Sequence, residues 1–127
     1  MEIRRLRVLI CGAREWDNYK LIKDTISKIN KKNMWGPIEC IIEGECRGAD
    51  IMAREAAKEL GIPFLPFPAD WKKHKKAAGQ IRNARMLKEG LPNLVIGFHN
   101  NIEQSTGTKD MLKRAKKAGI ETRLITE

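Results

Sequence analysis

Three short segments combine glycine with basic, hydroxyl or acidic residues, and each lies between an apolar run and a stretch with helical spacing. They read CGAR at Cys11–Arg14, GECRGAD at Gly44–Asp50 and STGTKD at Ser105–Asp110. Glycine lets a backbone approach a ligand closely, and the N–H groups at a helix N-terminus attract an anion. The pattern therefore predicts three turns that can hold a phosphate group.

The middle turn contains the largest set of candidate side chains. Gly44 and Gly48 permit close backbone approach, Arg47 can clamp a phosphate or carboxylate, and Asp50 can hold ribose hydroxyls. A plainer interpretation is that the glycines only turn the chain. Asp50 then only complements the helix dipole, which contributes typically about 0.3–1 kcal/mol.

The first and third turns leave a similar choice open. Gly12 and Arg14 fit either anion binding or a tight turn beside a solvated arginine. Gly107 and Thr108 offer donors for an oxyanion, and Asp110 on the same turn can face a reacting carbon, although helix capping explains the segment equally well. Asp110 is the strongest candidate for a catalytic carboxylate, and the alternatives are Glu43, Glu45 and Asp50.

Apolar and β-branched runs predict the strands that lead into these turns. Strands are expected at Arg7–Cys11, Ile38–Ile42, Ile62–Phe67, Asn93–Phe98 and Glu121–Ile125. The third run contains Pro63 and Pro66, and because proline cannot donate a ladder hydrogen bond, this strand should lie at a sheet edge.

Helical spacing fills the intervals between the strands. Helices are expected after an N-cap at Asp17, from about Ala49 to Leu60 with Gly61 as C-cap, from Ala77 to about Gly90, and from Gly107 to Ala118, whereas Pro68–Lys76 should form a polar loop. The first of these should end within Lys31–Gly36. Residues 1–127 are thus predicted to form one α/β domain, a Rossmann-like three-layer sandwich with a mainly parallel sheet of about five strands. Ligands bind such sheets beyond the carboxyl ends of the strands, where the three turns should meet.

Composition restricts the partners. The formal charge of +9 over 127 residues favours nucleotides, nucleic acid or an acidic protein surface. No apolar run approaches 18 residues and no signal peptide is recognisable, so we expect a cytoplasmic protein with no membrane partner. Neither a metal site nor a cofactor is indicated, because the cysteines form no CxxC pair, the two histidines have no ligand at suitable spacing, and no GxGxxG follows the first strand.

The loop around Trp71 supports a different partner. Four lysines and His74 follow this tryptophan, and such a run can bind nucleic acid with phosphates on the lysines and a base on the indole. A solvated charged loop is the plainer interpretation.

Taken together, four segments resemble the SLOG superfamily, a Rossmann-like group that includes the Lonely Guy phosphoribohydrolases and DprA/Smf. They are CGARE, EGECRGADIMAREAAKELGIP, PADWKKHKKAAGQIRNARM and GTKDMLKRAKKAGI. The combination is most similar to the small stand-alone YspA-like (cpYpsA-related) branch, which is common in bacteria and their phages.

The resemblance implies that the turns bind a nucleotide or nucleotide-derived signal, with the domain acting as a sensor or sequestering protein. It also implies a role for Asn83 and for Arg82, which helical periodicity alone would place at the surface. In Lonely Guy enzymes a matching arginine and a glutamate cleave the N-glycosidic bond of a nucleoside 5′-monophosphate, and here Arg82 and Asp110 are the catalytic candidates. Asp110 stands one position early, and HNNIEQST at His99–Thr106 replaces a proline-glycine-glycine segment. Related proteins often self-associate, which implies a homo-oligomer.

Overall fold

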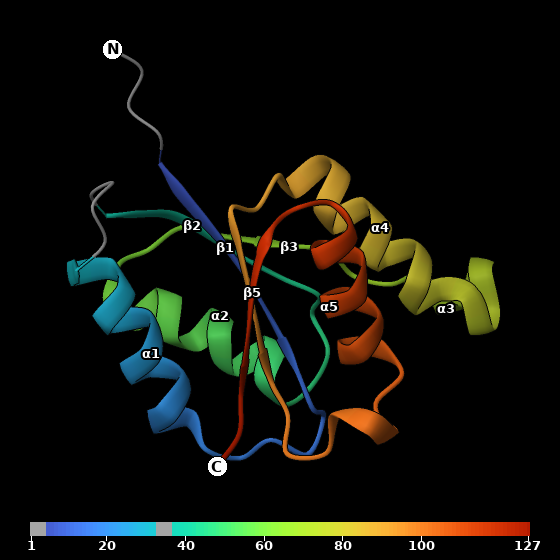
Figure 1. Cartoon of the computed structure of the whole chain (residues 1–127), viewed down its shortest axis with the longest axis horizontal. Coiled ribbons are helices and arrows are strands. Elements are labelled where there is room, and N and C mark those ends of the chain that lie inside the picture. The colour runs from blue at the N-terminus through green and yellow to red at the C-terminus, as the bar shows by residue number, and fades with distance from the viewer. Residues whose placement is uncertain (1–4, 33–36) are drawn as a thin grey trace.

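The strands form one parallel sheet in the computed structural model, which describes residues 5–32 and 37–127 (Figure 1). In spatial order the sheet runs β3-β2-β1-β4-β5, and every neighbouring pair is parallel. The bounds are Leu6–Gly12 for β1, Ile38–Glu43 for β2, Phe64–Pro66 for β3, Leu94–Phe98 for β4 and Glu121–Ile125 for β5. The predicted α/β class and strand number are confirmed, and the proline-containing strand lies at an edge.

Helices cover both faces of this sheet. They are α1 (Tyr19–Lys32), α2 (Ala49–Leu60), α3 (Trp71–His74), α4 (Ala78–Gly90) and α5 (Gly107–Lys117), with 3₁₀ turns η1 (Lys75–Ala77) and η2 (Ile102–Gln104). Alternate residues of β1 point to opposite faces, because side chains along a strand alternate. Val8 and Ile10 pack with α1 and α2, whereas Leu9 packs with α4 and α5. The result is the predicted three-layer sandwich (Figure 1).

Two local predictions were wrong. The first helix is capped by Asn18 rather than Asp17, because the Asn18 side chain accepts a hydrogen bond from Leu21 N at 3.0 Å. Part of the expected polar loop is helical, because Asp70 Oδ1 caps α3 by accepting from Lys73 N at 3.0 Å. The predicted end of the first helix falls partly on residues 33–36, which lie outside the described residues.

The topology creates a switch point beside the central strand. From β1 the chain moves outward through β2 and β3, then returns to place β4 and β5 on the other side of β1. The connections after β1 and β4 therefore diverge to opposite faces of the sheet, and a crevice opens between them at the carboxyl ends of these strands.

Candidate functional site

A cavity of about 420 Å³ lies at this switch point. The turn after β1 contributes residues 11–14, the turn after β2 contributes Cys46 and Asp50, and the segment before α5 contributes residues 105–108. The region from α3 to α4 forms the remaining wall, and His99 at the end of β4 also contacts the space. The three glycine turns thus meet in one site.

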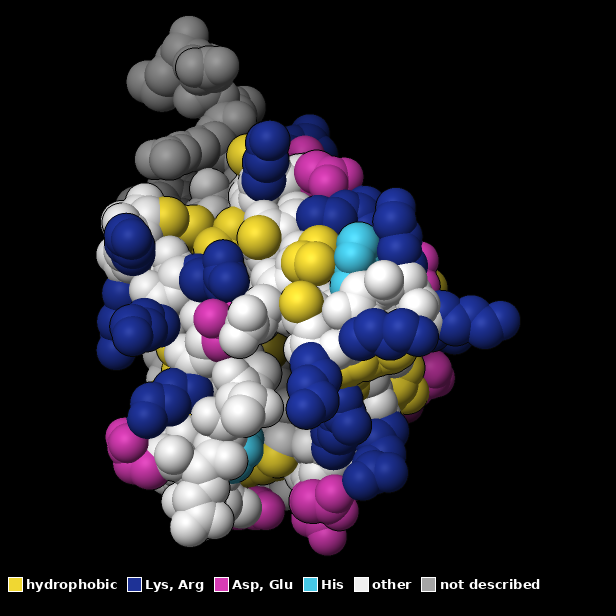
Figure 2. Space-filling model, turned by 90° about the vertical axis from the view of Figure 1, so that its right-hand side faces the viewer, with side chains coloured by type: hydrophobic (Ala, Val, Ile, Leu, Met, Phe, Trp, Pro, Cys, Tyr) yellow, Lys and Arg dark blue, Asp and Glu magenta, His cyan; other side chains and the backbone are white. Residues whose placement is uncertain are grey.

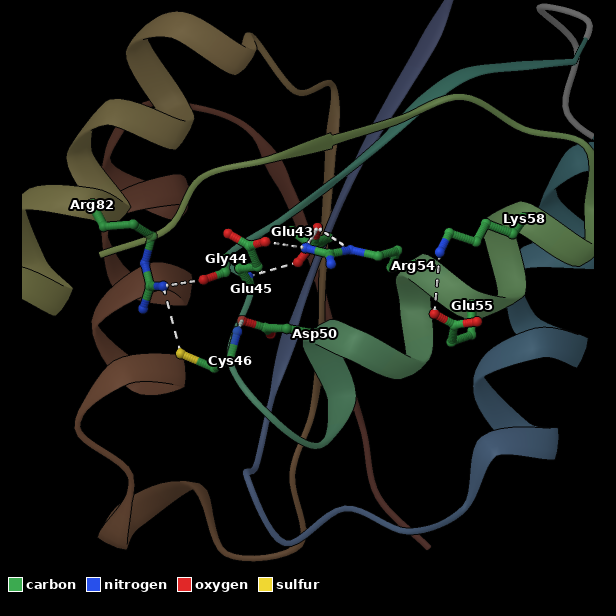
Figure 3. A network of polar contacts seen from close by, with 9 residues as sticks. All are labelled: Glu43, Gly44, Glu45, Cys46, Asp50, Arg54, Glu55, Lys58 and Arg82. Atoms are coloured by element: carbon green, nitrogen blue, oxygen red, sulfur yellow. Dashed lines mark hydrogen bonds and ion pairs between the residues drawn. The ribbon is translucent and has the colours of Figure 1, made fainter. Parts of the chain in front are cut away.

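Arg82 on α4 connects two of these turns. Arg82 is only 8% exposed, and its Nη1 donates to Gly44 O at 2.6 Å (Figure 3). Its Nε donates to Asn83 Oδ1 at 3.0 Å. Asn83 Nδ2 in turn donates to Gly107 O at 3.1 Å. The surface position that periodicity predicted for Arg82 is therefore wrong, since the side of α4 with Arg82 and Asn83 packs over the turns, whereas Ile81 is exposed.

One end of the Arg82 guanidinium makes no hydrogen bond within the described residues. Within residues 5–32 and 37–127, Nη2 has no hydrogen-bond partner, and no fully buried side-chain nitrogen or oxygen lacks one. Nη2 must therefore be accessible, and it lies beside Gly79, which lines the cavity as Arg82 does. A charged, planar donor presented in this way suits a phosphate or carboxylate oxygen.

Asp50 is the one acidic side chain among the described residues that line the cavity. It is 6% exposed, and its Oδ2 accepts from Cys46 N at 3.2 Å. Burial raises the pKa of Asp50 to about 7, against the opposing effect of the Arg82 charge. The carboxyl group can therefore lose or gain a proton near neutral pH, as a general acid or base must.

Two glycines of the middle turn are required by close packing. A Cβ at Gly44 would lie 2.5 Å from Arg82 Nη1 and 2.9 Å from Asp50 Oδ2, so a side chain there would separate these two groups. Gly48 has a φ of 85°, and a Cβ there would collide with the carbonyl oxygens of Ala13 and Arg14. Gly48 therefore joins the middle turn to the first one.

Several predicted site residues lie outside the cavity lining. Asp110 Oδ2 accepts from Asn83 Nδ2 at 3.0 Å and from Arg114 Nε at 2.8 Å. Arg47 forms an exposed ion pair with Glu15 at 2.8 Å. Buried Glu43 and neighbouring Glu45 each form an ion pair with Arg54 at 2.9 Å, and these two ion pairs join the middle turn to α2 (Figure 3).

The start of α5 offers fewer donors than its sequence indicates. Ser105 Oγ accepts from Thr108 N at 3.0 Å and from Lys109 N at 3.3 Å. The Ser105 side chain thus caps the helix, as the alternative interpretation of this turn predicted, and two backbone N–H groups are not free to bind an anion. Thr108 is buried, and Gly107 lies against the cavity.

An exposed aromatic ring, that of Trp71, lies at the mouth of the cavity, although the sequence indicated only a place in a charged loop. Trp71 is 47% exposed and lines the cavity together with Lys76. The guanidinium carbon of Arg14 lies 5.8 Å from the centre of the Trp71 ring, within range of a cation–π contact.

The short helix α3 could have been predicted from the sequence, because Asp70 immediately before Trp71 is a favoured N-cap residue.

Comparison with known proteins identifies the family. Residues 6–74, more than half of the chain, match the family described as YspA, cpYpsA-related SLOG. The chain belongs to this SLOG family. It is also 32% identical over 119 residues to the Gene 61 protein of Mycobacterium phage D29, covering 90% of this chain and 91% of the phage protein.

A likeness in fold extends beyond the residues that match the family. The structure of DNA processing protein A (DprA) from Streptococcus pneumoniae superposes with a TM-score of 0.74 at 17% identity. The superposition covers 96% of this chain, and the chain spans about half the length of the DprA chain. The likeness confirms the Rossmann-like α/β fold over nearly the whole chain, including α4 and α5, which follow the family match. No helix in the described part of the chain is long and apolar enough to cross a membrane.

Proposed function

We propose that the cavity binds a nucleotide or nucleotide-derived signalling ligand, and that the domain acts as a sensor or sequestering protein. The observation that carries the proposal is Nη2 of Arg82, which has no hydrogen-bond partner among the residues that the structure describes. It belongs to a buried side chain that lines the cavity, and the exposed Trp71 and Lys76 line the same cavity. Membership of the SLOG family supports the same class of ligand.

The phosphate group fits best between Arg82 and the start of α5. Asn83 links these two elements, since it accepts from Arg82 Nε and donates to Gly107 O. An anion placed beside Nη2 would thus also experience the positive end of the α5 dipole. Lys76 and Arg14 add positive charge nearer the opening.

The base fits best at the mouth. Trp71 presents a half-exposed ring there, and stacking of a base on an aromatic ring contributes about 1–3 kcal/mol. Asp50 lies deeper and, when ionised, can accept hydrogen bonds from ribose hydroxyls. Phosphate, sugar and base thereby each have a separate contact.

The test is incubation of the purified protein with AMP, N6-substituted AMP, NAD, ADP-ribose and cyclic nucleotides. The filtrate and the heat-released ligand are then analysed by mass spectrometry. Depletion of one compound from the filtrate and its intact recovery on heating is the expected result. Arg82→Gln should lose this depletion, whereas Arg85→Gln, on the same helix but outside the cavity lining, should keep it. A panel that stays entirely in the filtrate would contradict the proposal.

The same assay tests the phosphoribohydrolase alternative. Release of free base and ribose phosphate would make the protein an enzyme rather than a binding protein. The buried carboxyl group of Asp50 beside Arg82 is the observation that favours this chemistry, because it lines the cavity and titrates near pH 7.

A second candidate function is nucleic-acid binding over α3. On the face that includes this region, Lys and Arg side chains cover more of the surface than Asp and Glu side chains do (Figure 2). Four of the five residues that follow Trp71 are lysines. This function predicts affinity for single-stranded DNA or RNA that falls steeply with salt and that weakens when Lys72 and Lys73 are changed to Gln. A binding constant unchanged by salt would exclude it.

A further inference from the structure

Cys46 has a different environment from the other two cysteines. Cys11 also lines the cavity, but Cys11 and Cys40 are both buried, and burial raises the pKa of both thiols. Cys46 is only partly buried, lines the cavity, and places its Sγ 3.6 Å from Arg82 Nη1 (Figure 3). It is therefore the thiol best placed to meet a reagent from solvent.

The cavity around this thiol favours negatively charged reagents. Arg82 is more than nine-tenths buried and lines the same cavity as Cys46, and its Nη2 has no hydrogen-bond partner in the described part of the chain. Arg14 and Lys76 also contribute to the lining, where Asp50 is the one acidic side chain among the described residues. A reagent carrying a carboxylate can thus bind Arg82 while its sulfur lies near Cys46.

We propose that Cys46 is a modification site for small anionic disulfides and that the resulting adduct closes the cavity. The Cys46 thiol releases its proton to solvent, and the thiolate attacks one sulfur of the disulfide. A new S–S bond joins Cys46 to one half of the reagent while the other half leaves as a thiolate. Cys46 is oxidised and the reagent supplies the oxidising equivalents, so the exchange is balanced.

The adduct closes the cavity because Cys46, to which it is attached, lines the same cavity as Arg82. A carboxylate attached through Cys46 can bind Nη2 of Arg82, the same group that the proposed phosphate would use. This consequence, unlike the modification itself, rests on the proposed function.

The test compares two disulfides of similar length, the dianion 3,3′-dithiodipropionate and the dication cystamine. Each rate of mixed-disulfide formation is divided by the rate of the same reagent with N-acetylcysteine amide, which corrects for intrinsic reactivity. Peptide mapping by mass spectrometry locates the adduct. We expect modification at Cys46, with a normalised preference for the dianion of about tenfold at about 0.01 M salt that nearly disappears at about 1 M.

Variants separate the role of Arg82 from general charge. Arg82→Gln should reduce the preference for the dianion, and Arg85→Gln, which alters an exposed arginine on the same helix, should preserve it. If Arg82→Gln does not fold, the comparison uses Lys76→Gln, which removes an exposed cation of the cavity lining and should reduce the preference where Arg85→Gln does not. Adducts forming at Cys11 or Cys40 as fast as at Cys46, or a preference that salt does not change, would overturn the proposal.

A final measurement concerns closure of the cavity. The ligand found with the nucleotide panel should no longer bind the Cys46 adduct, and dithiothreitol should restore binding. Undiminished binding to the adduct would overturn the closure. If no nucleotide binds the unmodified protein, the proposed function fails while the Cys46 modification is still decided by the rates.

Discussion

Arg82 Nη1 lies 2.6 Å from the carbonyl oxygen of Gly44, and this contact joins helix α4 to the turn after β2. The two residues are 38 positions apart in the chain. Because Gly44 has no side chain, the Arg82 guanidinium and the Asp50 carboxylate can both lie close to its Cα. The position of the charged group in the cavity therefore depends on the glycine.

Removal of Arg82 should destabilise the protein. Arg82→Ala leaves Gly44 O and Asn83 Oδ1 without their donors in a buried setting, which should lower the free energy of unfolding by about 3 kcal/mol. Urea denaturation measures the loss. The exposed Arg85→Ala on the same helix should unfold nearly as the wild type does, and equal losses in the two variants would show that the Arg82 contacts add no stability.

Gly48 should tolerate alanine less well than Gly61. Both residues have positive φ, 85° and 70°, but a Cβ at Gly48 meets backbone oxygens whereas a Cβ at Gly61 meets nothing within 4 Å. Gly61→Ala should cost about 1 kcal/mol from backbone strain alone. Gly48→Ala should cost at least about 2 kcal/mol more, because the two turns must separate. Similar melting temperatures for the two variants would argue against this packing.

Asp50 should make stability depend on pH. Its pKa is raised to about 7 in the folded state, so the folded protein binds more protons than the unfolded chain above the ordinary aspartate pKa. The contribution of Asp50 to the free energy of unfolding should therefore be largest below about pH 4, fall as the pH rises to about 7, and then level off, with a total change of at most about 4 kcal/mol.

The matched variant for this titration is Asp50→Asn, which keeps an oxygen to accept from Cys46 N. Burial also raises the pKa of Glu43, so only the difference between wild type and variant reports on Asp50. Denaturation curves from about pH 4 to pH 8 should show a weaker pH dependence in the variant. Parallel curves would assign the titration to other groups.

Trp71 should matter for ligand affinity and little for stability. Trp71→Ala removes a half-exposed ring from the cavity mouth, which should raise Kd about tenfold to a hundredfold if a base stacks there. Isothermal titration with the ligand found in the panel measures the change. Leu124→Ala, an exposed apolar residue on β5, is the control, and an unchanged Kd for Trp71→Ala would place the base elsewhere.

Release of base and ribose phosphate, if the panel yields them, permits a test of two carboxylates. Asp50→Asn should reduce kcat by about a hundredfold or more, as expected for loss of a general acid or base. Asp110→Asn should have a smaller effect because Asp110 binds Asn83 and Arg114 outside the cavity lining. A larger loss of kcat in Asp110→Asn than in Asp50→Asn would instead identify Asp110 as the catalytic carboxylate, as the sequence predicted.

Elements set by local interactions could be predicted closely. The helix after the middle turn runs from Ala49 to Leu60 as expected, and Gly61 ends it in the left-handed conformation. Pro63 and Pro66 correctly indicated an edge strand, since a proline lacks the donor that a central strand needs. Each of these signals lies within the element that it specifies or next to it.

Features that join distant segments could not be predicted in this way. A helical periodicity describes one helix alone, so it gave no indication that Arg82 reaches Gly44 or that Asp110 pairs with Asn83. Burial of Asp50, which raises its pKa, likewise depends on several segments that meet around it.

By itself the sequence determined the alternation of strands and helices and the three glycine turns at one edge, because backbone preferences and apolar spacing are local properties. Only the tertiary structure decided which side chains share the cavity. It brought Cys46, Asp50 and Arg82 together, placed Trp71 at the mouth and left Asp110 outside the lining. These positions follow from packing between α4, α5 and the turns, and such contacts depend on the whole fold.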